Sequence, residues 1–444
     1  MCRPFRAIAA LVLLLLSASL AAQSNSDLAA IRAAAHPITG LSSDYDALMN
    51  AIDDKRVVFL GEATHGTAEF QEERARISER LINERDFRAV VVEGDFRDIA
   101  RLNDFVLGRG SDRDVVSAFG DVTGFPLWMW RNAQFAAFVL WLRQYNASVA
   151  AELRVRLIGM DLQNPISSVD ALIDYLARTD PAAAARARQR YGCFDPYRDD
   201  MLQYGYASPG TPAGVCRQPA IDEFNEMSAR YAAGLADDAL FDALQDARVV
   251  MNGETYYRVI ASRTMSSWIV RDQHFLDTLD AIRSRYAAKI AVWTHNTHTG
   301  DARATQGVEP NVSQFARERW PGETFLAGFS TYAGTVVAAH EWDGEGRLQP
   351  LLPAQSRSDA ALLHAAIPAN FYLLTSDPVL QPVLGAARLQ RAVGVVYLPE
   401  TELQSHYFMA VIASEFDAVI HIDITRGVDT LLPTFAARHR AVGH

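Results

Sequence analysis

Two short segments carry the residue types best suited to acid–base chemistry. Glu62 and His65 lie three residues apart, immediately after the apolar stretch 57–60. His295 and His298 have the same spacing and follow a second apolar stretch. An imidazole works as a general base near neutral pH when a carboxylate orients it and stabilises its cationic form. These residues therefore predict proton-transfer chemistry with His65 as the base.

Two more apolar stretches also end in an acid. Residues 89–92 lead into Glu93, and residues 155–158 lead into Asp161. Short stretches rich in β-branched residues and separated by helical patterns are typical of buried parallel strands. The carboxyl ends of such strands line the ligand crevice of an α/β sheet. We therefore predict an α/β fold, with a central, largely parallel sheet flanked by helices, that brings four strand ends to one site.

Arg74 lies on the apolar face of a predicted helix, between Phe70 and Ile77. A guanidinium on a core-facing stripe is costly unless a carboxylate pairs with it. The acids at the strand ends are its natural partners, so we expect Arg74 to point toward them. The predicted catalytic set is then Glu62, His65, Arg74, Glu93, His295 and His298. In this set the two glutamates would orient His65, and the arginine and the other histidines would stabilise an oxyanion.

Four further residues are candidates for substrate binding: Trp128, Trp130, Asp161 and Arg271. Each also has a structural alternative. The two tryptophans could belong to the hydrophobic core, Asp161 could cap the helix that follows its strand, and Arg271 could form a surface ion pair with Asp272.

Several familiar catalytic motifs do not occur in the sequence. It has no G-x-S-x-G elbow, no P-loop, no G-x-G-x-x-G fingerprint and no H-E-x-x-H helix. We therefore expect neither a metal nor another cofactor. One alternative is a metal-dependent hydrolase in which the His and Glu side chains bind a divalent cation, since no spacing is diagnostic of either case. A second alternative is a periplasmic ligand-binding protein without turnover.

Composition and the N-terminus restrict the setting in which the protein works. The 444 residues carry a net charge of −11 and show no basic stripe, which disfavours a nucleic-acid partner. Residues 1–22 have a basic start, a short apolar core and small residues near Ala21, as in a cleaved secretory signal. We expect a periplasmic or secreted protein with no membrane contact after cleavage. Its oligomeric state cannot be predicted.

The mature chain would retain Cys193 and Cys216. In an oxidising compartment two cysteines in loop-like flanks commonly form a disulfide, although two free thiols are the alternative. Both lie in residues 165–285, an Ala- and Arg-rich helical stretch predicted to form a cap domain. Residues 23–164 and 286–444 would make up the α/β core, with a further strand at 393–398.

The sequence resembles the erythromycin esterase family. The matching motifs are Gly61-Glu62-Ala63-Thr64-His65-Gly66, Arg74, Val92-Glu93-Gly94, Trp130-Arg131-Asn132, Gly159-Met160-Asp161, Arg271-Asp272, Trp293-Thr294-His295-Asn296-Thr297-His298 and Phe416-Asp417-Ala418. The resemblance implies an α/β core with a helical domain and an active site in the cleft between them. It implies hydrolysis of a small-molecule ester, a macrolide lactone in the resistance enzymes, by metal-free activation of water and without a covalent intermediate.

In this family the catalytic histidine corresponds to His65, and the other five residues of the predicted catalytic set match the remaining site positions. The family's substrate cannot be assigned to this chain in the same way. An exported member is not an obvious cytoplasmic drug-inactivating enzyme, and the segment around Cys193 and Cys216 has no motif that identifies a substrate. Macrolide cleavage is therefore a hypothesis.

Overall fold

The computed structural model describes residues 25–120, 126–208, 216–234, 237–263 and 266–431. The expected signal segment, residues 1–22, lies outside this part of the chain. Among the described residues, no helix combines the length and apolar character needed to cross a membrane.

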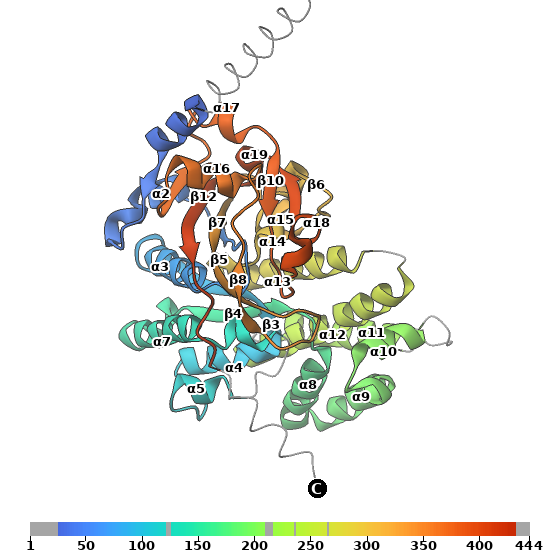
Figure 1. Cartoon of the computed structure of the whole chain (residues 1–444). Helices are drawn as coiled ribbons and strands as arrows, with labels where there is room; N and C mark the ends of the chain where they lie inside the picture. The colour runs from blue at the N-terminus through green and yellow to red at the C-terminus, as the bar shows by residue number, and fades with distance from the viewer. Residues whose placement is uncertain (1–24, 121–125, 209–215, 235–236, 264–265, 432–444) are drawn as a thin grey trace, which may run out of the picture.

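The described residues form a nine-stranded mixed sheet (Figure 1). In spatial order its strands are β1 (His36–Pro37), β9 (Phe371–Leu374), β12 (Ala418–Thr425), β7 (Thr324–Ala338), β2 (Val57–Leu60), β5 (Lys289–Trp293), β3 (Phe87–Asp95) and β4 (Arg156–Asp161), with β8 (Arg347–Leu351) paired to β7. From β12 to β4 every pairing is parallel, whereas β1, β9 and β8 are antiparallel to their neighbours. The predicted α/β fold with a largely parallel sheet is confirmed.

The four strands expected to carry the site are neighbours. β2 pairs with β5, β5 with β3, and β3 with β4. Because the pairs are parallel, all four carboxyl ends lie on the same edge of the sheet. The polar residues that follow the strands are therefore brought together although they are far apart in the sequence.

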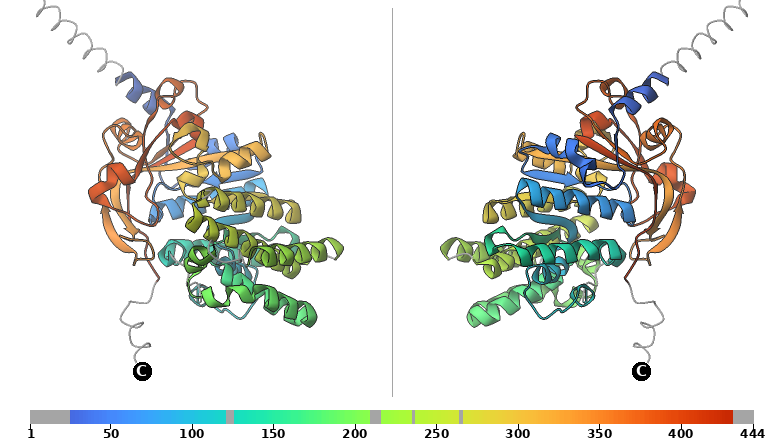
Figure 2. Two further views of the ribbon diagram at one scale, coloured as in Figure 1. Left: turned by 90° about the vertical axis from the view of Figure 1, so that its right-hand side faces the viewer. Right: turned by 90° about the vertical axis from the view of Figure 1, so that its left-hand side faces the viewer.

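Alternate residues of β2 face two different helical layers, as the two-residue period of a strand requires. Val58 and Leu60 belong to the core cluster that contains α3 (Ala68–Arg85) and α7 (Ala133–Ser148). Val57 and Phe59 pack with α13 (Ser267–Tyr286) and α15 (Val312–Arg319) on the other face. The two side views in Figure 2 show the helices stacked along the sheet.

The predicted helical insertion contains five helices with a core of their own: α8 (Pro165–Thr179), α9 (Pro181–Tyr191), α10 (Met201–Ala207), α11 (Arg217–Ala233) and α12 (Asp238–Ser262). Its described residues form no strand. Figure 1 shows α8–α11 gathered beyond the β4 edge of the sheet. The last helix of the predicted cap, α13, instead packs on the sheet through Phe275, Leu279 and Ile282. α13 therefore contacts both the sheet and α12 of the insertion.

A smaller three-stranded sheet lies next to the main one, in the order β10 (Arg388–Arg391), β11 (Tyr407–Ala410) and β6 (Thr305–Gln306). Between β10 and β11 the chain passes the end of β2, where Val393 forms an isolated bridge with Thr64, and Val396 forms another with Ala339. The prediction of a strand at residues 393–398 is therefore wrong. These residues connect two elements by single bridges and pair with no strand along their length.

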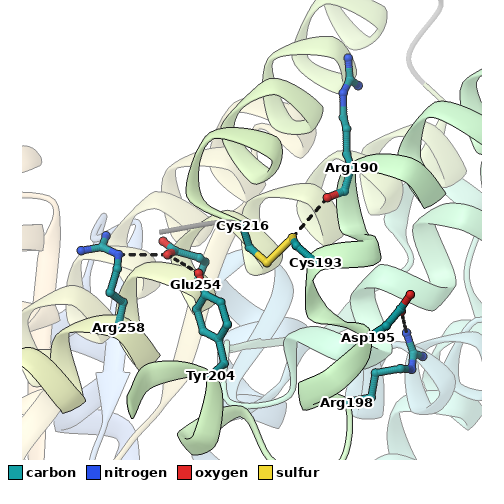
Figure 3. The surroundings of a disulfide bond; sticks show 8 residues. All are labelled: Arg190, Cys193, Asp195, Arg198, Tyr204, Cys216, Glu254 and Arg258. Atoms are coloured by element: carbon teal, nitrogen blue, oxygen red, sulfur yellow. Dashed lines mark hydrogen bonds and ion pairs between the residues drawn. A yellow bond between two sulfur atoms is a disulfide. The ribbon is translucent and has the colours of Figure 1, made fainter. Parts of the chain in front are cut away.

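Cys193 and Cys216 form a disulfide with a Cα–Cα distance of 5.7 Å (Figure 3). The bond ties the short helix at Gly192–Tyr197 to the start of α11. Close by, Tyr204 donates to Glu254, which also accepts from Arg258. The disulfide therefore closes a loop within the core of the insertion.

Replacing both cysteines with serine should lower the free energy of unfolding by about 3 kcal/mol, because the bond restricts a loop of 23 residues in the unfolded chain. Chemical denaturation with and without reductant would measure the change, and reductant should not affect the double variant. Two titratable thiols in the denatured, unreduced protein would contradict the bond.

Candidate active site

A cavity of about 590 Å³ opens at the carboxyl ends of the four strands. Its floor is polar and comes from the strand ends and from α13: His65, Glu93, Asp161, Arg271, His295 and His298. Its walls include aromatic side chains from several parts of the chain: Trp130, Tyr256, Trp268, Trp342, Tyr407 and Phe408. The cavity thus joins a set of ionisable groups to an apolar surface.

Glu62 links His65 to Arg74 below the cavity floor. One carboxylate oxygen accepts from Nδ1 of His65 at 2.8 Å, and the other accepts from Nη2 of Arg74 at 2.8 Å. Glu62 and Arg74 are completely buried, and the Arg74 guanidinium lies 5.0 Å from the Trp293 ring centroid. With its proton on Nδ1, His65 has the lone pair of Nε2 available for a proton. His65 itself lines the cavity.

Backbone contacts hold the turn that carries His65. The His65 N–H donates to the Val393 carbonyl, and the Val393 N–H donates to the carbonyl of Ala63. At Gly61 a Cβ atom would overlap the side-chain oxygen of Asn296, so this position needs glycine. The turn is therefore fixed both to the neighbouring strand end and to the 392–398 connection.

Glu93 is the centre of a second network. Its Oε2 accepts the backbone N–H of His295 at 2.9 Å, and its Oε1 accepts from Arg271 at 2.9 Å. The same Oε1 lies 3.3 Å from Nε2 of His298. Burial alone would raise the pKa of Glu93, but His298 and Arg271 hold it well below its usual value. Glu93 is therefore an anion that positions cations and the His295 turn, and the predicted bond from Glu93 to His65 is absent.

Arg271 crosses the cavity floor from α13. It forms a two-point ion pair with Asp161 at 3.0 and 2.6 Å, in addition to its bond to Glu93. Two-point pairing fixes the orientation of a guanidinium as well as its position. Arg271 is therefore part of the buried network rather than a partner of Asp272 on the surface.

His298 is held between two carboxylates. Its Nδ1 lies 2.8 Å from Asp272, and the Trp268 ring stacks on its imidazole at 4.4 Å. Burial lowers the pKa of His298, but Asp272 and Glu93 outweigh it and raise the pKa to about 9. The Arg271 guanidinium, 3.1 Å from Nε2, also disfavours the cation and is likewise outweighed. His298 is thus a cation at neutral pH.

His295 lies beside His65, with the two ring centroids 4.8 Å apart. Burial and the neighbouring His65 lower the pKa of His295 well below its usual value, although Glu93 favours the charged form. The ring is therefore neutral. The backbone N–H of Thr297 donates to its Nδ1, and the Thr297 hydroxyl, 2.9 Å from the same atom, can donate to it as well, an arrangement that suits a ring proton on Nε2. Among the described residues this Nε2 forms no hydrogen bond within 3.5 Å, although the backbone of Ala63 lies close enough to the ring to favour its charged form.

The arrangement does not fit the metal site considered from the sequence. Within the described ranges no three His, Cys, Asp or Glu side chains are grouped so as to hold a metal ion. The Nδ1 of His65 is bonded to Glu62, and Arg271 occupies carboxylate oxygens of Glu93 and Asp161.

The residues predicted for the site lie in three places: at the cavity surface, behind His65 and in the hydrophobic core. His65, Glu93, Asp161, Arg271, His295, His298 and Trp130 line the cavity. Glu62 and Arg74 lie behind His65, so Arg74 cannot contact an oxyanion directly, contrary to expectation. Trp128 does not line the cavity and packs in the hydrophobic core, which corrects its predicted role in substrate binding.

Two residues that contact His298 were missed as site residues. The sequence marks Asp272 only as a surface partner of Arg271 and as part of the Arg271-Asp272 motif, and Trp268 has no pattern that separates it from a core tryptophan. Asp272 could have been found from its place on the helix that leads into the His295 strand. Its carboxylate is fully buried and needs a partner.

The sequence profile of the erythromycin esterase family matches residues 82–425. The chain belongs to this family. Among curated proteins, it is 25% identical over 130 residues to erythromycin esterase type I of Escherichia coli and 29% identical over 119 residues to type II of the same organism. These segments cover 29% and 27% of the chain, and only 30% and 26% of the relatives.

Three solved structures have the same fold as this family member. A protein from Bacillus cereus superposes with a TM-score of 0.79 at 20% identity, covering 92% of this chain and 99% of the other. A succinoglycan biosynthesis protein gives 0.77 at 19%, covering 91% and 98%. A mutant erythromycin esterase in its open conformation gives 0.65 at 16%, covering 88% and 96%. The family profile establishes membership, and these structures establish the fold alone.

The charge on His298 predicts a pH-dependent stability. Because its folded pKa of about 9 exceeds the ordinary 6.5, the contribution is fully present below about pH 6.5 and is lost as the pH rises through about 9. The stability advantage of the wild type over His298→Gln should therefore fall by on the order of 3 kcal/mol between these pH values. Urea unfolding at several pH values would measure it, with His36→Gln at the sheet edge as the control. An advantage that does not change with pH would contradict the buried cation.

Proposed function

We propose that the protein hydrolyses carboxylic esters by direct attack of water, with His65 as the general base. The observation that carries this proposal is the Glu62–His65 pair, in which Glu62 accepts from Nδ1 and leaves Nε2 of a cavity-lining imidazole free to take a proton. Among the described residues His65 forms no hydrogen bond to a serine or cysteine, so the nucleophile that it best serves is water.

The reaction proceeds in two steps. Nε2 of His65 takes a proton from water as the water oxygen bonds to the ester carbonyl carbon, which gives a tetrahedral oxyanion and an imidazolium stabilised by Glu62. The carbon–oxygen bond to the alcohol then breaks, and His65 returns the proton to the departing alkoxide. The products are a carboxylic acid and an alcohol. A positioned base of this kind contributes roughly 10²–10⁴-fold to the rate.

His295 is suited to stabilise the oxyanion. Its neutral ring carries the proton on Nε2, which makes no hydrogen bond within 3.5 Å to the described residues beyond a looser approach to the Ala63 backbone, and the ring lies beside His65. A buried donor without a partner costs about 1–3 kcal/mol, and an oxyanion would remove this cost. The cations His298 and Arg271 add positive charge to the floor. Arg74 acts through Glu62 and is a positioning residue.

We also propose that the enzyme works in the periplasm or outside the cell. The signal-like residues 1–22 and the disulfide support this location. The names of the curated relatives make a macrolide lactone one candidate substrate, alongside simpler esters.

Replacing His65 with asparagine should lower kcat/KM for p-nitrophenyl esters by roughly 10²–10⁴-fold, because the base is lost. The melting temperature should fall only modestly, since the asparagine amide can still donate to the buried Glu62 carboxylate that His65 contacts. His36→Asn is the matched control and should behave like the wild type. Full activity in a folded His65→Asn variant would remove His65 from the mechanism, and binding of esters without turnover in the wild type would indicate a binding protein.

Activity should survive exhaustive dialysis against a chelator, because the site residues are bonded to one another as described above. Elemental analysis of the dialysed protein should accompany the assay. Loss of activity that is restored by a divalent cation would favour the metal-dependent alternative.

A further inference from the structure

The connection between β7 and β8 places an exposed tryptophan at the cavity. Trp342 lines the cavity and is 56% exposed. Among the described lining residues it is the only large apolar side chain that is mostly open to solvent, whereas Trp130 is almost completely buried. A half-exposed tryptophan offers a broad, rigid apolar face that a ligand can cover.

The hairpin that carries Trp342 is fixed to the catalytic turn. In β7 the N–H of Val337 donates to the carbonyl of Gly66, the residue after His65. Beyond β7, the N–H of Ala339 donates to Val395, and its carbonyl accepts from Tyr397. Because Gly66 and Val393 also hold the His65 turn, the position of Trp342 relative to the base is set by short backbone links.

Trp128, which does not contact the cavity, supports the other arm of the hairpin. Gly346 lies directly against its indole ring, and a Cβ atom at this position would overlap ring atoms. The ring cannot move aside easily, because Trp128 is 2% exposed within the core. Trp128 and Gly346 therefore set where the returning arm of the hairpin lies.

We propose that Trp342 is a specificity-determining residue whose indole face stacks on the apolar part of a large ester while the carbonyl lies at His65. This proposal rests on the proposed function, and it assigns to Trp342 the contact that the sequence suggested for Trp128. The preferred substrates are esters that carry an aromatic ring system or a similarly broad apolar group. Small esters, which do not reach the rim, gain nothing from Trp342.

The test compares two esters with the same aliphatic leaving group, ethyl acetate and ethyl 1-naphthylacetate, whose hydrolysis is followed by acid release in a pH-stat. In Trp342→Ala, kcat/KM for the large ester relative to the small one should fall about 10- to 100-fold, from the loss of apolar contact area. Trp342→Phe should retain part of the preference. Leu348→Ala removes a similarly exposed residue of the same hairpin that does not line the cavity, and its ratio should equal that of the wild type. An unchanged ratio in Trp342→Ala would overturn the proposal.

Gly346→Ala provides a second test without altering any lining residue. The added methyl group must displace the hairpin from Trp128, so the ratio should fall as in Trp342→Ala, and an unchanged ratio would contradict the role of the hairpin. Calorimetric binding of 1-naphthylacetate, which needs no turnover, separates this proposal from the proposed function. Weaker binding in Trp342→Ala than in Leu348→Ala would support the apolar contact even if esters were not hydrolysed, and equal binding would overturn it.

Discussion

The site depends on the full burial of one carboxylate, that of Glu62, between a cation and an imidazole. Without Arg74 its negative charge would be unpaired in the core, and without His65 one of its oxygens would lack a partner. The two bonds fix the proton of His65 on Nδ1 and therefore make Nε2 the atom that faces the reaction. The same pairing explains why a core-facing helix stripe contains an arginine.

The second network, centred on Glu93, positions the remaining residues of the cavity floor around His65. Glu93 gathers the N–H of His295, the Arg271 guanidinium and the His298 imidazolium around one carboxylate. Its two cations are shared with Asp161 and Asp272, so each charge has an opposite charge within contact distance. Such a network keeps the His295 turn next to His65. It also leaves the cavity floor nearly balanced in charge, while the aromatic walls provide the apolar surface.

Much of this arrangement could be predicted from the sequence, because parallel strands place their ends on one edge. The four apolar stretches were sufficient to bring Glu62, Glu93, Asp161 and His295 together. Side-chain direction could not be predicted in the same way. Arg271 and Asp272 are consecutive on one helix and both reach His298, but only Arg271 also reaches Glu93 and Asp161. The tryptophan that lines the rim follows a long strand into a hairpin, where no periodicity distinguishes Trp342 from Trp128. Residues 393–398 have the composition of a strand. They form only single β-bridges, however, one with Thr64 and one with Ala339.

The central claim is that Glu62 holds His65 with its proton on Nδ1, and ¹⁵N NMR of the His65 imidazole tests it most directly. In the neutral ring of the wild type, the proton should lie on Nδ1 and Nε2 should be unprotonated. In Glu62→Gln, whose amide cannot stabilise the imidazolium, activity should fall even where the folded state is retained. A His65 ring with its proton on Nε2 in the wild type would contradict the account.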